Sequence, residues 1–154
     1  MKTKIIIFFL LFLLSSCGYE AIHSKKNSIN YNFSISKVAL IGDREVNLKI
    51  KEKLNNYTLN QKNKSFTLKI SSTSEKRILA KDMAGDATSF QSSITVNVEV
   101  LTNGNFKNNF VIEEKFNYNN NSNKFNLKSY EKDIKNNLAE TATDKLIFKL
   151  SNIQ

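Results

Sequence analysis

The sequence has few of the residues that build disulfides, zinc sites and tight turns. Its 154 residues include one cysteine, one histidine, four glycines and no proline or tryptophan. A single cysteine cannot form an intramolecular disulfide, and one cysteine with one histidine cannot build a structural zinc site from nitrogen and sulfur ligands. The length suits one domain and is too short for two ordinary ones.

Motifs of enzymes are also missing. There is no Gly-x-Gly-x-x-Gly loop, P-loop or His-Glu-x-x-His pattern. His23 lies in a polar segment without an orienting partner, and the adjacent Glu113 and Glu114 point to opposite faces of a strand. Asp82 and Asp86 flank a glycine, but two carboxylates fall short of the roughly six to eight oxygens that calcium takes. The sequence predicts no enzyme, no cofactor and no metal site.

The chain begins with a short basic segment and a long apolar run. Lys2 and Lys4 precede ten consecutive apolar residues at 5–14. As a helix, this run rises about 15 Å, roughly half of the ~30 Å hydrocarbon core, so it is too short to span a membrane alone. A basic start followed by an apolar run of this length is typical of a secretory signal peptide.

The apolar run ends in Leu-Ser-Ser-Cys, which places the only cysteine, Cys17, directly after two small residues. This tetrapeptide resembles a bacterial lipobox. The resemblance implies that residues 1–16 are removed and that the thiol of Cys17 receives a diacylglycerol. Gly18, rather than an aspartate, follows the cysteine. By the same resemblance, this favours sorting to the outer membrane. The alternative is an ordinary signal peptide with a chance cysteine at its end.

The excess of positive charge would suit a nucleic-acid partner, but the predicted export of the protein argues against one. Lys and Arg number 23 against 14 Asp and Glu, a formal net charge of +9. Loss of Lys2 and Lys4 with the signal peptide leaves about +7. An exported, membrane-tethered protein has no ordinary access to nucleic acid. Anionic lipid head groups or a lysine-rich composition explain the charge better.

After a lipidated N-terminus and tether at 17–30, residues 31–154 predict a single α+β domain. An alternating pattern predicts a strand over 31–41. Asp43 is then placed to cap a helix by accepting hydrogen bonds from backbone N–H groups. The apolar stripe of that helix consists of Val46, Ile50, Leu54 and Tyr57.

Three further strands are predicted from alternating apolar and polar residues. The first covers 66–71, with 77–79 continuing it past a polar kink. The other two, 94–100 and 106–118, form a hairpin around Asn103-Gly104, a pair well suited to a type I′ turn. One face of the returning strand carries Phe106, Phe110, Ile112, Phe116 and Tyr118.

The last part of the chain predicts a loop and a helix. Residues 117–126 include six asparagines and are predicted as a loop, and a helix with Ser129 as a candidate N-cap follows at about 127–150. The order β-α-β-β-β-α predicts a two-layer sandwich with two helices packed on one face of a four-stranded sheet. The other face is predicted to stay polar, lined by Thr95, Asn97, Glu99, Asn109, Glu113 and Lys115.

Basic side chains concentrate in two stretches. One flanks the connection between the second and third strands and consists of Lys76, Arg77 and Lys81. The other flanks the start of the last helix and consists of Lys124, Lys128 and Lys132. The spacing of four places the second group on one helix face if the helix begins early enough. Both groups have the alternative of being ordinary solvated lysines.

A combination of features spans almost all of the mature chain. It comprises Cys17-Gly18-Tyr19 at the mature start, Lys81, Asp82 and Gly85 in a loop before an alternating strand, and Phe116 and Tyr118 at the end of the fourth strand. Together with the length and the element order, these features resemble the lipopolysaccharide-assembly lipoprotein family, LptE.

The resemblance implies a non-enzymatic outer-membrane lipoprotein, facing the periplasm or lying within a barrel lumen. Such proteins partner a large β-barrel, LptD, help it to assemble, and bind lipopolysaccharide on its way to the outer leaflet. Lysines can bind phosphates as point charges, so Arg77, Lys81 and Lys128 are the candidate lipopolysaccharide-binding residues. Only Arg44 and Arg77 are arginines, which limits bidentate phosphate binding. The alternative is a structural lipoprotein of another envelope complex, in barrel assembly or cell-wall attachment.

Overall fold

The computed structural model describes residues 32–58, 62 and 64–153; the predicted signal peptide and the whole predicted tether at 17–30, Cys17 included, lie outside the described residues. Helices and strands follow the predicted order β-α-β-β-β-α. They are β1 (Phe33–Gly42), α2 (Arg44–Leu54), β2 (Lys64–Lys81), β3 (Ala87–Thr102), β4 (Asn105–Asn119) and α3 (Lys124–Ser151). A short 3₁₀ helix, η2 (Asn55–Tyr57), follows α2 directly.

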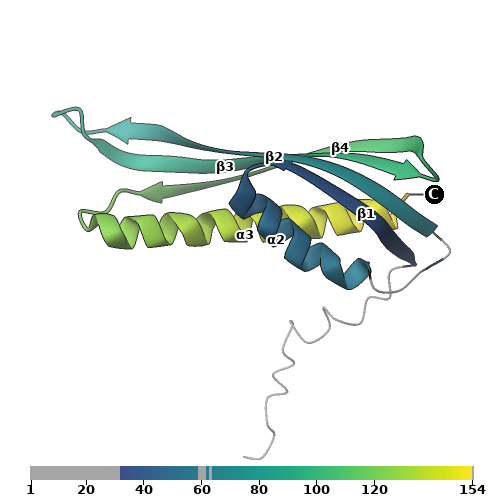
Figure 1. Ribbon diagram of the computed structural model, residues 1–154. Helices are drawn as coiled ribbons and strands as arrows, with labels where there is room; N and C mark the ends of the chain where they lie inside the picture. Colours follow the sequence, from purple (N-terminus) through teal and green to yellow (C-terminus); the bar gives the residue numbers. More distant parts are fainter. Residues whose placement is uncertain (1–31, 59–61, 63, 154) are drawn as a thin grey trace, which may run out of the picture. The chain divides into compact units, whose positions relative to one another are not determined.

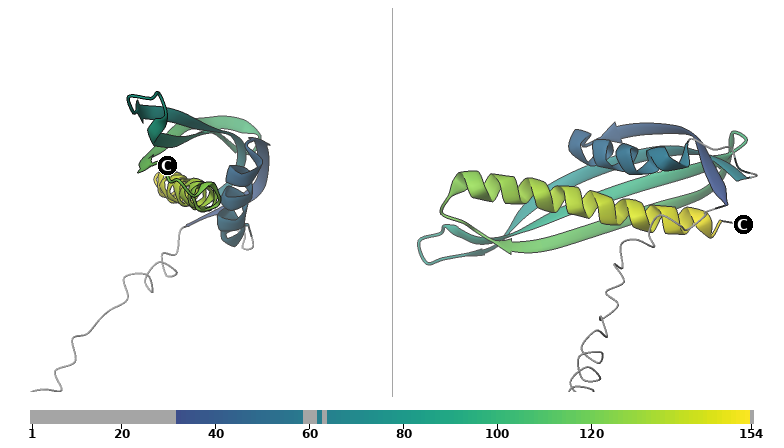
Figure 2. Two further views of the ribbon diagram at one scale, coloured as in Figure 1. Left: turned by 90° about the vertical axis from the view of Figure 1, so that its left-hand side faces the viewer. Right: turned by 90° about the horizontal axis from the view of Figure 1, so that it is seen from below.

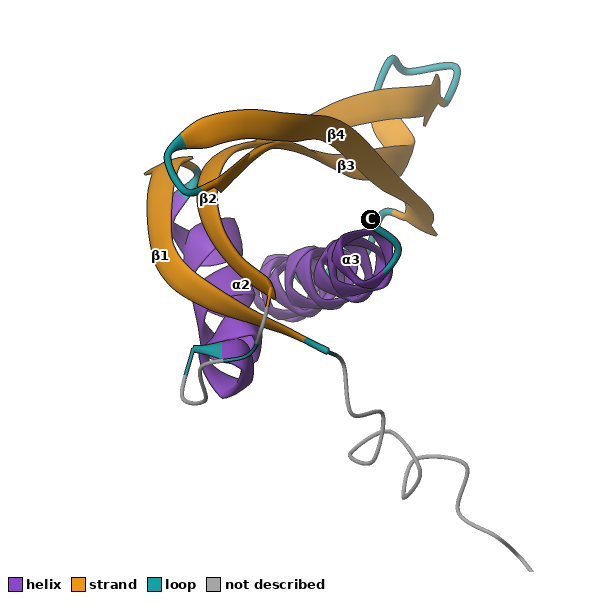
Figure 3. Cartoon of the chain, turned by 90° about the vertical axis from the view of Figure 1, so that its right-hand side faces the viewer, coloured by secondary structure: helices purple, strands orange, loops and turns teal. Residues whose placement is uncertain are grey.

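The four strands form one mixed sheet with the spatial order β1-β2-β3-β4. β1 and β2 are parallel, and α2 lies in the crossover connection that a parallel pair requires. The other two pairs are antiparallel. Both helices lie on the same side of the sheet, which curves around them (Figures 1, 2 and 3). The predicted α+β fold, with two helices on one face of four strands, is confirmed.

The core lies between this inner face and the two helices. The sheet contributes Leu68, Ile70, Ile94, Val96, Val98 and Val100, and the helices contribute Val46, Ile50, Leu54, Leu138, Leu146 and Leu150. Two residues of the predicted apolar helix stripes, Tyr57 and Tyr130, are not part of this core. Tyr57 stacks on Phe33 from η2, with ring centroids 5.4 Å apart, and Tyr130 is 47% exposed.

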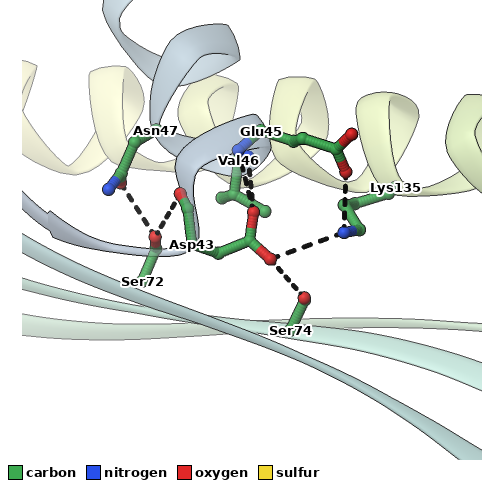
Figure 4. Close-up of polar contacts among 7 residues, drawn as sticks. All are labelled: Asp43, Glu45, Val46, Asn47, Ser72, Ser74 and Lys135. Carbon is green, nitrogen blue, oxygen red and sulfur yellow. Dashed lines mark hydrogen bonds and ion pairs between the residues drawn. The ribbon is translucent and has the colours of Figure 1, made fainter.

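The second strand is longer than predicted, because β2 continues without a break for 18 residues. The predicted polar kink is wrong, since the start of α2 supplies partners for the serines within it. Ser72 donates to Oδ1 of Asn47 at 2.8 Å, and Ser74 donates to Oδ2 of Asp43 at 2.5 Å (Figure 4). β1 pairs with β2 only as far as Ser72. The β2–β3 hairpin therefore projects beyond the end of β1 (Figure 1).

The asparagine-rich stretch 117–126 is mostly regular structure. β4 ends at Asn119, and Asn123 is the N-cap of α3. The Asn123 side chain accepts hydrogen bonds from the backbone N–H groups two and three residues further on, both at 3.1 Å. The predicted cap, Ser129, lies inside the helix instead. That prediction is wrong because Asn123 already satisfies the first unpaired N–H groups, so the helix begins earlier.

The outer face of the sheet is largely polar. The predicted outer residues Thr95, Asn97, Glu99, Asn109, Glu113 and Lys115 share it through their cross-strand pairing. Lys69 and Glu99 form an ion pair there at 3.1 Å, and exposed apolar side chains on this face include Ile41 and Val111. Phe106 was predicted to face the core but is 65% exposed. A register shift in the β3–β4 pairing interrupts the alternation that the prediction assumed.

Candidate functional site

The three candidate site residues Arg77, Lys81 and Lys128 lie at one end of the domain, and all are exposed. Here the β2–β3 hairpin projects past β1, and the end of β4 leads into α3 (Figure 1). We call residues 76–90 and 117–132 the hairpin end. The topology thus gathers two basic stretches that lie far apart in the sequence.

Arg77 is paired with a neighbour on its own strand. Its Nε donates to Oε1 of Glu75 and its Nη2 donates to Oε2, both at 2.8 Å. Residues two apart in a strand share a face, which explains why the two side chains meet. The hydrogen bond from Arg77 lowers the pKa of Glu75. Both groups therefore stay ionised, and the pair adds no net charge to the surface.

Lys76 is engaged in a cluster that joins the hairpin to β4 and α3. Its ammonium group lies 2.5 Å from Oε1 of Glu131 and 3.9 Å from the ring centroid of Phe90. The hydroxyl of Tyr118 donates to the same Glu131 oxygen at 2.9 Å. Burial raises the pKa of Tyr118, and the hydrogen bond to Glu131 raises it further. Tyr118 thus remains a protonated donor, and the cluster is structural.

The remaining lysines of the hairpin end have no acidic partner in direct contact. Lys81, Lys128 and Lys132 are exposed and form no ion pair with any residue that the structure describes. Lys124 donates to Oδ1 of Asn120 at 3.4 Å. Because α3 begins at Lys124, the predicted condition is met and the three helix lysines share one face.

A groove of about 750 Å³, absent from the sequence-based predictions, opens between these elements. Its walls come from β2, β3, β4, the connection to α3 and the first two turns of that helix. The lining residues are Leu79, Ser89, Asn117, Tyr118, Asn119, Asn120, Asn121, Asn126, Leu127 and Tyr130. The asparagines of 117–126 are the only sequence signal for this groove. Predicting the whole stretch as a loop misses that its side chains form one wall of the groove.

The described residues offer neither a metal site nor a membrane-spanning helix. Within the described residues, no group of three or more His, Cys, Asp or Glu side chains could hold a metal ion. The carboxylate of Asp82 accepts hydrogen bonds from the N–H groups of Ala84 and Asp86, so it orders its own turn. None of the helices in the described ranges is long and apolar enough to cross a membrane.

The chain is similar to known proteins in both sequence and fold. The sequence pattern of LptE, described as lipopolysaccharide-assembly, matches residues 35–150, which spans the sheet and both helices. The chain belongs to the LptE family. No curated protein sequence matches it. The LptE match covers the hairpin end as well as the core, so the candidate residues on β2 and α3 lie inside the matched region.

Solved structures with the same fold are lipoproteins of low sequence identity. Rare lipoprotein B from Shewanella oneidensis is 17% identical, with a TM-score of 0.57 over 75% of this chain and 93% of that chain. A minor lipoprotein from Acinetobacter baumannii is 14% identical, with a TM-score of 0.55 over 79% and 91%. Lipoprotein B from Nitrosomonas europaea is 13% identical, with a TM-score of 0.59 over 79% and 86%. At these identities, the similarity to the solved structures shows only that this chain shares their fold.

Proposed function

We propose that this protein is a non-enzymatic outer-membrane lipoprotein that partners a large LptD-like β-barrel in assembling and exporting lipopolysaccharide. The observation that carries the proposal is the LptE-family match over residues 35–150. Lipidation of Cys17, in the lipobox-like Leu-Ser-Ser-Cys, would anchor the domain to the membrane. A single domain on a lipid anchor then acts by binding and needs no catalytic group.

The outer sheet face is suited to a barrel lumen. The lumens of large outer-membrane barrels are polar, and this face presents hydroxyls, amides and ion pairs such as Lys69–Glu99. Both helices cover the opposite face (Figure 2). The domain therefore keeps its apolar residues in its own core while offering a polar surface to the barrel wall.

The hairpin end is suited to the anionic part of lipopolysaccharide. Lys81 and Lys128 are exposed and form no ion pair with any described acidic group, so they can approach phosphate. Arg77 belongs to the same end of the domain but is held by Glu75. Its guanidinium would have to exchange that carboxylate for a phosphate, so we assign the larger share of binding to the lysines.

Affinity purification tests the partnership. Tagged protein from solubilised outer membrane should retain one large β-barrel, and Asn97→Trp on the outer face should reduce the amount retained. Leu48→Trp is the matched control, because Leu48 is 56% exposed on α2, which covers the inner side of the sheet. Purification without any large barrel contradicts the proposal.

Depletion separates this function from that of another envelope complex. Loss of surface lipopolysaccharide with normal levels of other barrels supports lipopolysaccharide export. A general deficit of barrels, or a cell-wall attachment defect with normal surface lipopolysaccharide, supports the alternative of a structural lipoprotein in barrel assembly or cell-wall attachment.

A further inference from the structure

We propose that the groove of the hairpin end binds an uncharged oligosaccharide. The groove has a volume of about 750 Å³, within the roughly 300–1,000 Å³ range of small-molecule sites. Its natural ligand would be the sugar portion of lipopolysaccharide, and that identification rests on the proposed function. The chemistry of the groove stands independently of it.

The groove lining contains no charged side chain. Glu131, the acidic group behind the Tyr118 wall, is already neutralised by Lys76 and by the Tyr118 hydroxyl. Phosphates and carboxylates are bound by arginine, lysine or several converging N–H groups, and metal ions need carboxylates. The lining therefore favours a ligand that is polar and uncharged.

Five asparagines supply the polar wall, and the structure leaves much of their hydrogen-bonding capacity unused. The side chains of Asn119 and Asn126 form no hydrogen bond within the described part of the chain. Asn117 accepts from Gln91 through Oδ1 and keeps its NH₂ group. An amide offers donors and an acceptor side by side, which matches neighbouring sugar hydroxyls that both donate and accept.

Asn120 holds the wall in place. Its Nδ2 donates to the carbonyl oxygen of Ala87 at 2.6 Å, and its backbone N–H donates to that of Thr88 at 2.8 Å. Its Oδ1 accepts from the backbone N–H of Asn121 at 2.9 Å. These bonds connect the β4–α3 connection to the hairpin. The groove is thus formed before a ligand arrives, which lowers the entropic cost of binding.

Tyr130 supplies the apolar surface that a sugar ring requires. It is 47% exposed, lines the groove, and meets Tyr118 edge-on at 86° with ring centroids 6.0 Å apart. The face of an aromatic ring is electronegative and attracts the C–H groups of a pyranose. Leu79 and Leu127 add apolar contacts. Amides around an aromatic ring fit a polyol with one apolar face better than a lipid chain.

Equilibrium dialysis of the full mature lipoprotein in detergent tests the proposal. The probe is tritium-labelled core oligosaccharide from the cell's own lipopolysaccharide, delipidated, dephosphorylated and carboxyl-reduced so that it carries no charge; lipid A without core sugars and whole lipopolysaccharide are the other two probes. We expect saturable binding of the oligosaccharide that Asn126→Ala and Tyr130→Leu each weaken by about fivefold. Asn137→Ala, an exposed asparagine on the same helix, should bind normally.

Each outcome bears on one proposal. No saturable oligosaccharide binding, or equal binding by wild type and Asn126→Ala, overturns the sugar groove. Asn126 is exposed, so its variant keeps the test valid if Tyr130→Leu perturbs folding. If the oligosaccharide binds but neither lipid A nor whole lipopolysaccharide does, the groove stands and the proposed lipopolysaccharide role fails. If lipid A binds and the oligosaccharide does not, the proposed lipopolysaccharide role stands and the sugar groove fails.

Discussion

The ammonium group of Lys135 on α3 lies 3.4 Å from Oδ2 of Asp43, the N-cap residue of α2 (Figure 4). Lys135 also pairs with Glu45 at 2.8 Å. The other carboxylate oxygen of Asp43 accepts from the N–H groups of Glu45 and Val46, and Oδ2 accepts from Ser74 of β2. One side chain therefore connects the start of a helix, the strand beneath it and the second helix.

Replacing Asp43 should destabilise the domain. Asp43→Ala removes the N-cap, the acceptor of the Ser74 hydroxyl and one of the two carboxylates that pair with Lys135. We therefore expect a loss of about 2 kcal/mol in the free energy of unfolding. Asp43→Asn keeps an acceptor for the cap and should lose about half as much. Urea unfolding measures both. Asp133→Ala, an exposed aspartate on α3, should change stability by less than about 0.5 kcal/mol.

Stability should depend on pH through the same pair. Burial alone would raise the pKa of Asp43, but hydrogen bonds from Ser74 and Val46 and the charge of Lys135 bring it below its ordinary value of 3.8. Its contribution is therefore present above that value and is lost as the pH falls through the folded pKa. Urea unfolding should show the wild-type advantage over Asp43→Asn shrinking below about pH 4. A constant difference down to pH 2 would contradict the assignment.

Lys135 should act at the opposite end of the pH scale. Burial alone would lower its pKa, but the hydrogen bond to Glu45 and the charges of Asp43 and Glu45 raise it above 10.5. Because the pKa is raised in the folded state, the charged ammonium group stabilises the fold below pH 10.5. This contribution disappears as the pH rises through the folded pKa. Lys135→Met should therefore lose stability at neutral pH and approach wild type at the alkaline end, as measured by urea unfolding.

A methyl group at Gly42 should be poorly tolerated. Gly42 has φ +104°, and a Cβ there would lie 1.9 Å from the carbonyl oxygen of Ser72 on the paired strand. Relief requires β1 and β2 to separate, so Gly42→Ala should cost more than about 3 kcal/mol in unfolding free energy. Gly104→Ala is the matched control, with φ +80° but open space around it. It should cost only about 1 kcal/mol, and equal losses in both variants would contradict the clash.

Lipopolysaccharide binding should depend on the unpaired lysines. Lys81→Ala and Lys128→Ala should each weaken binding by about fivefold at low salt and reduce its salt sensitivity. Arg77→Ala should have less than about a twofold effect, because Glu75 already neutralises the guanidinium. Binding of labelled lipopolysaccharide over a salt series measures this. Lys51→Ala, an exposed lysine on α2, is the control, and equal losses there would indicate nonspecific attraction.

The lipid anchor has a direct test. Cys17→Ala should yield an unacylated, mislocalised precursor, since the thiol is the only group that could accept the diacylglycerol. Labelled fatty acid should enter the wild-type chain alone. Normal labelling of the variant would refute the lipobox assignment.

Local patterns carried much of the fold. The order of helices and strands followed from period-2 and period-3.6 apolar spacing. The position of Asp43 alone predicts a helix cap, and the structure confirms it. Asn103-Gly104 adopts the positive φ values, 52° and 80°, that the predicted turn requires. These features are local because backbone sterics and hydrogen bonds act over a few residues.

Tertiary pairing decided the rest. Ser72 and Ser74 look like a break in the chain, yet they continue β2 because Asn47 and Asp43 meet them from another element. Lys76 looks like a surface cation, but Glu131, far along the chain, neutralises it.

The sequence by itself determined the order of elements, the turns, the cap at Asp43 and the lipobox-like cysteine, because each depends on neighbours in the chain. Only the tertiary structure decided which lysines remain unpaired and that the asparagines wall a groove with Tyr130. Those properties depend on contacts between β2, β4 and α3. Such contacts arise only when the sheet curves around the helices.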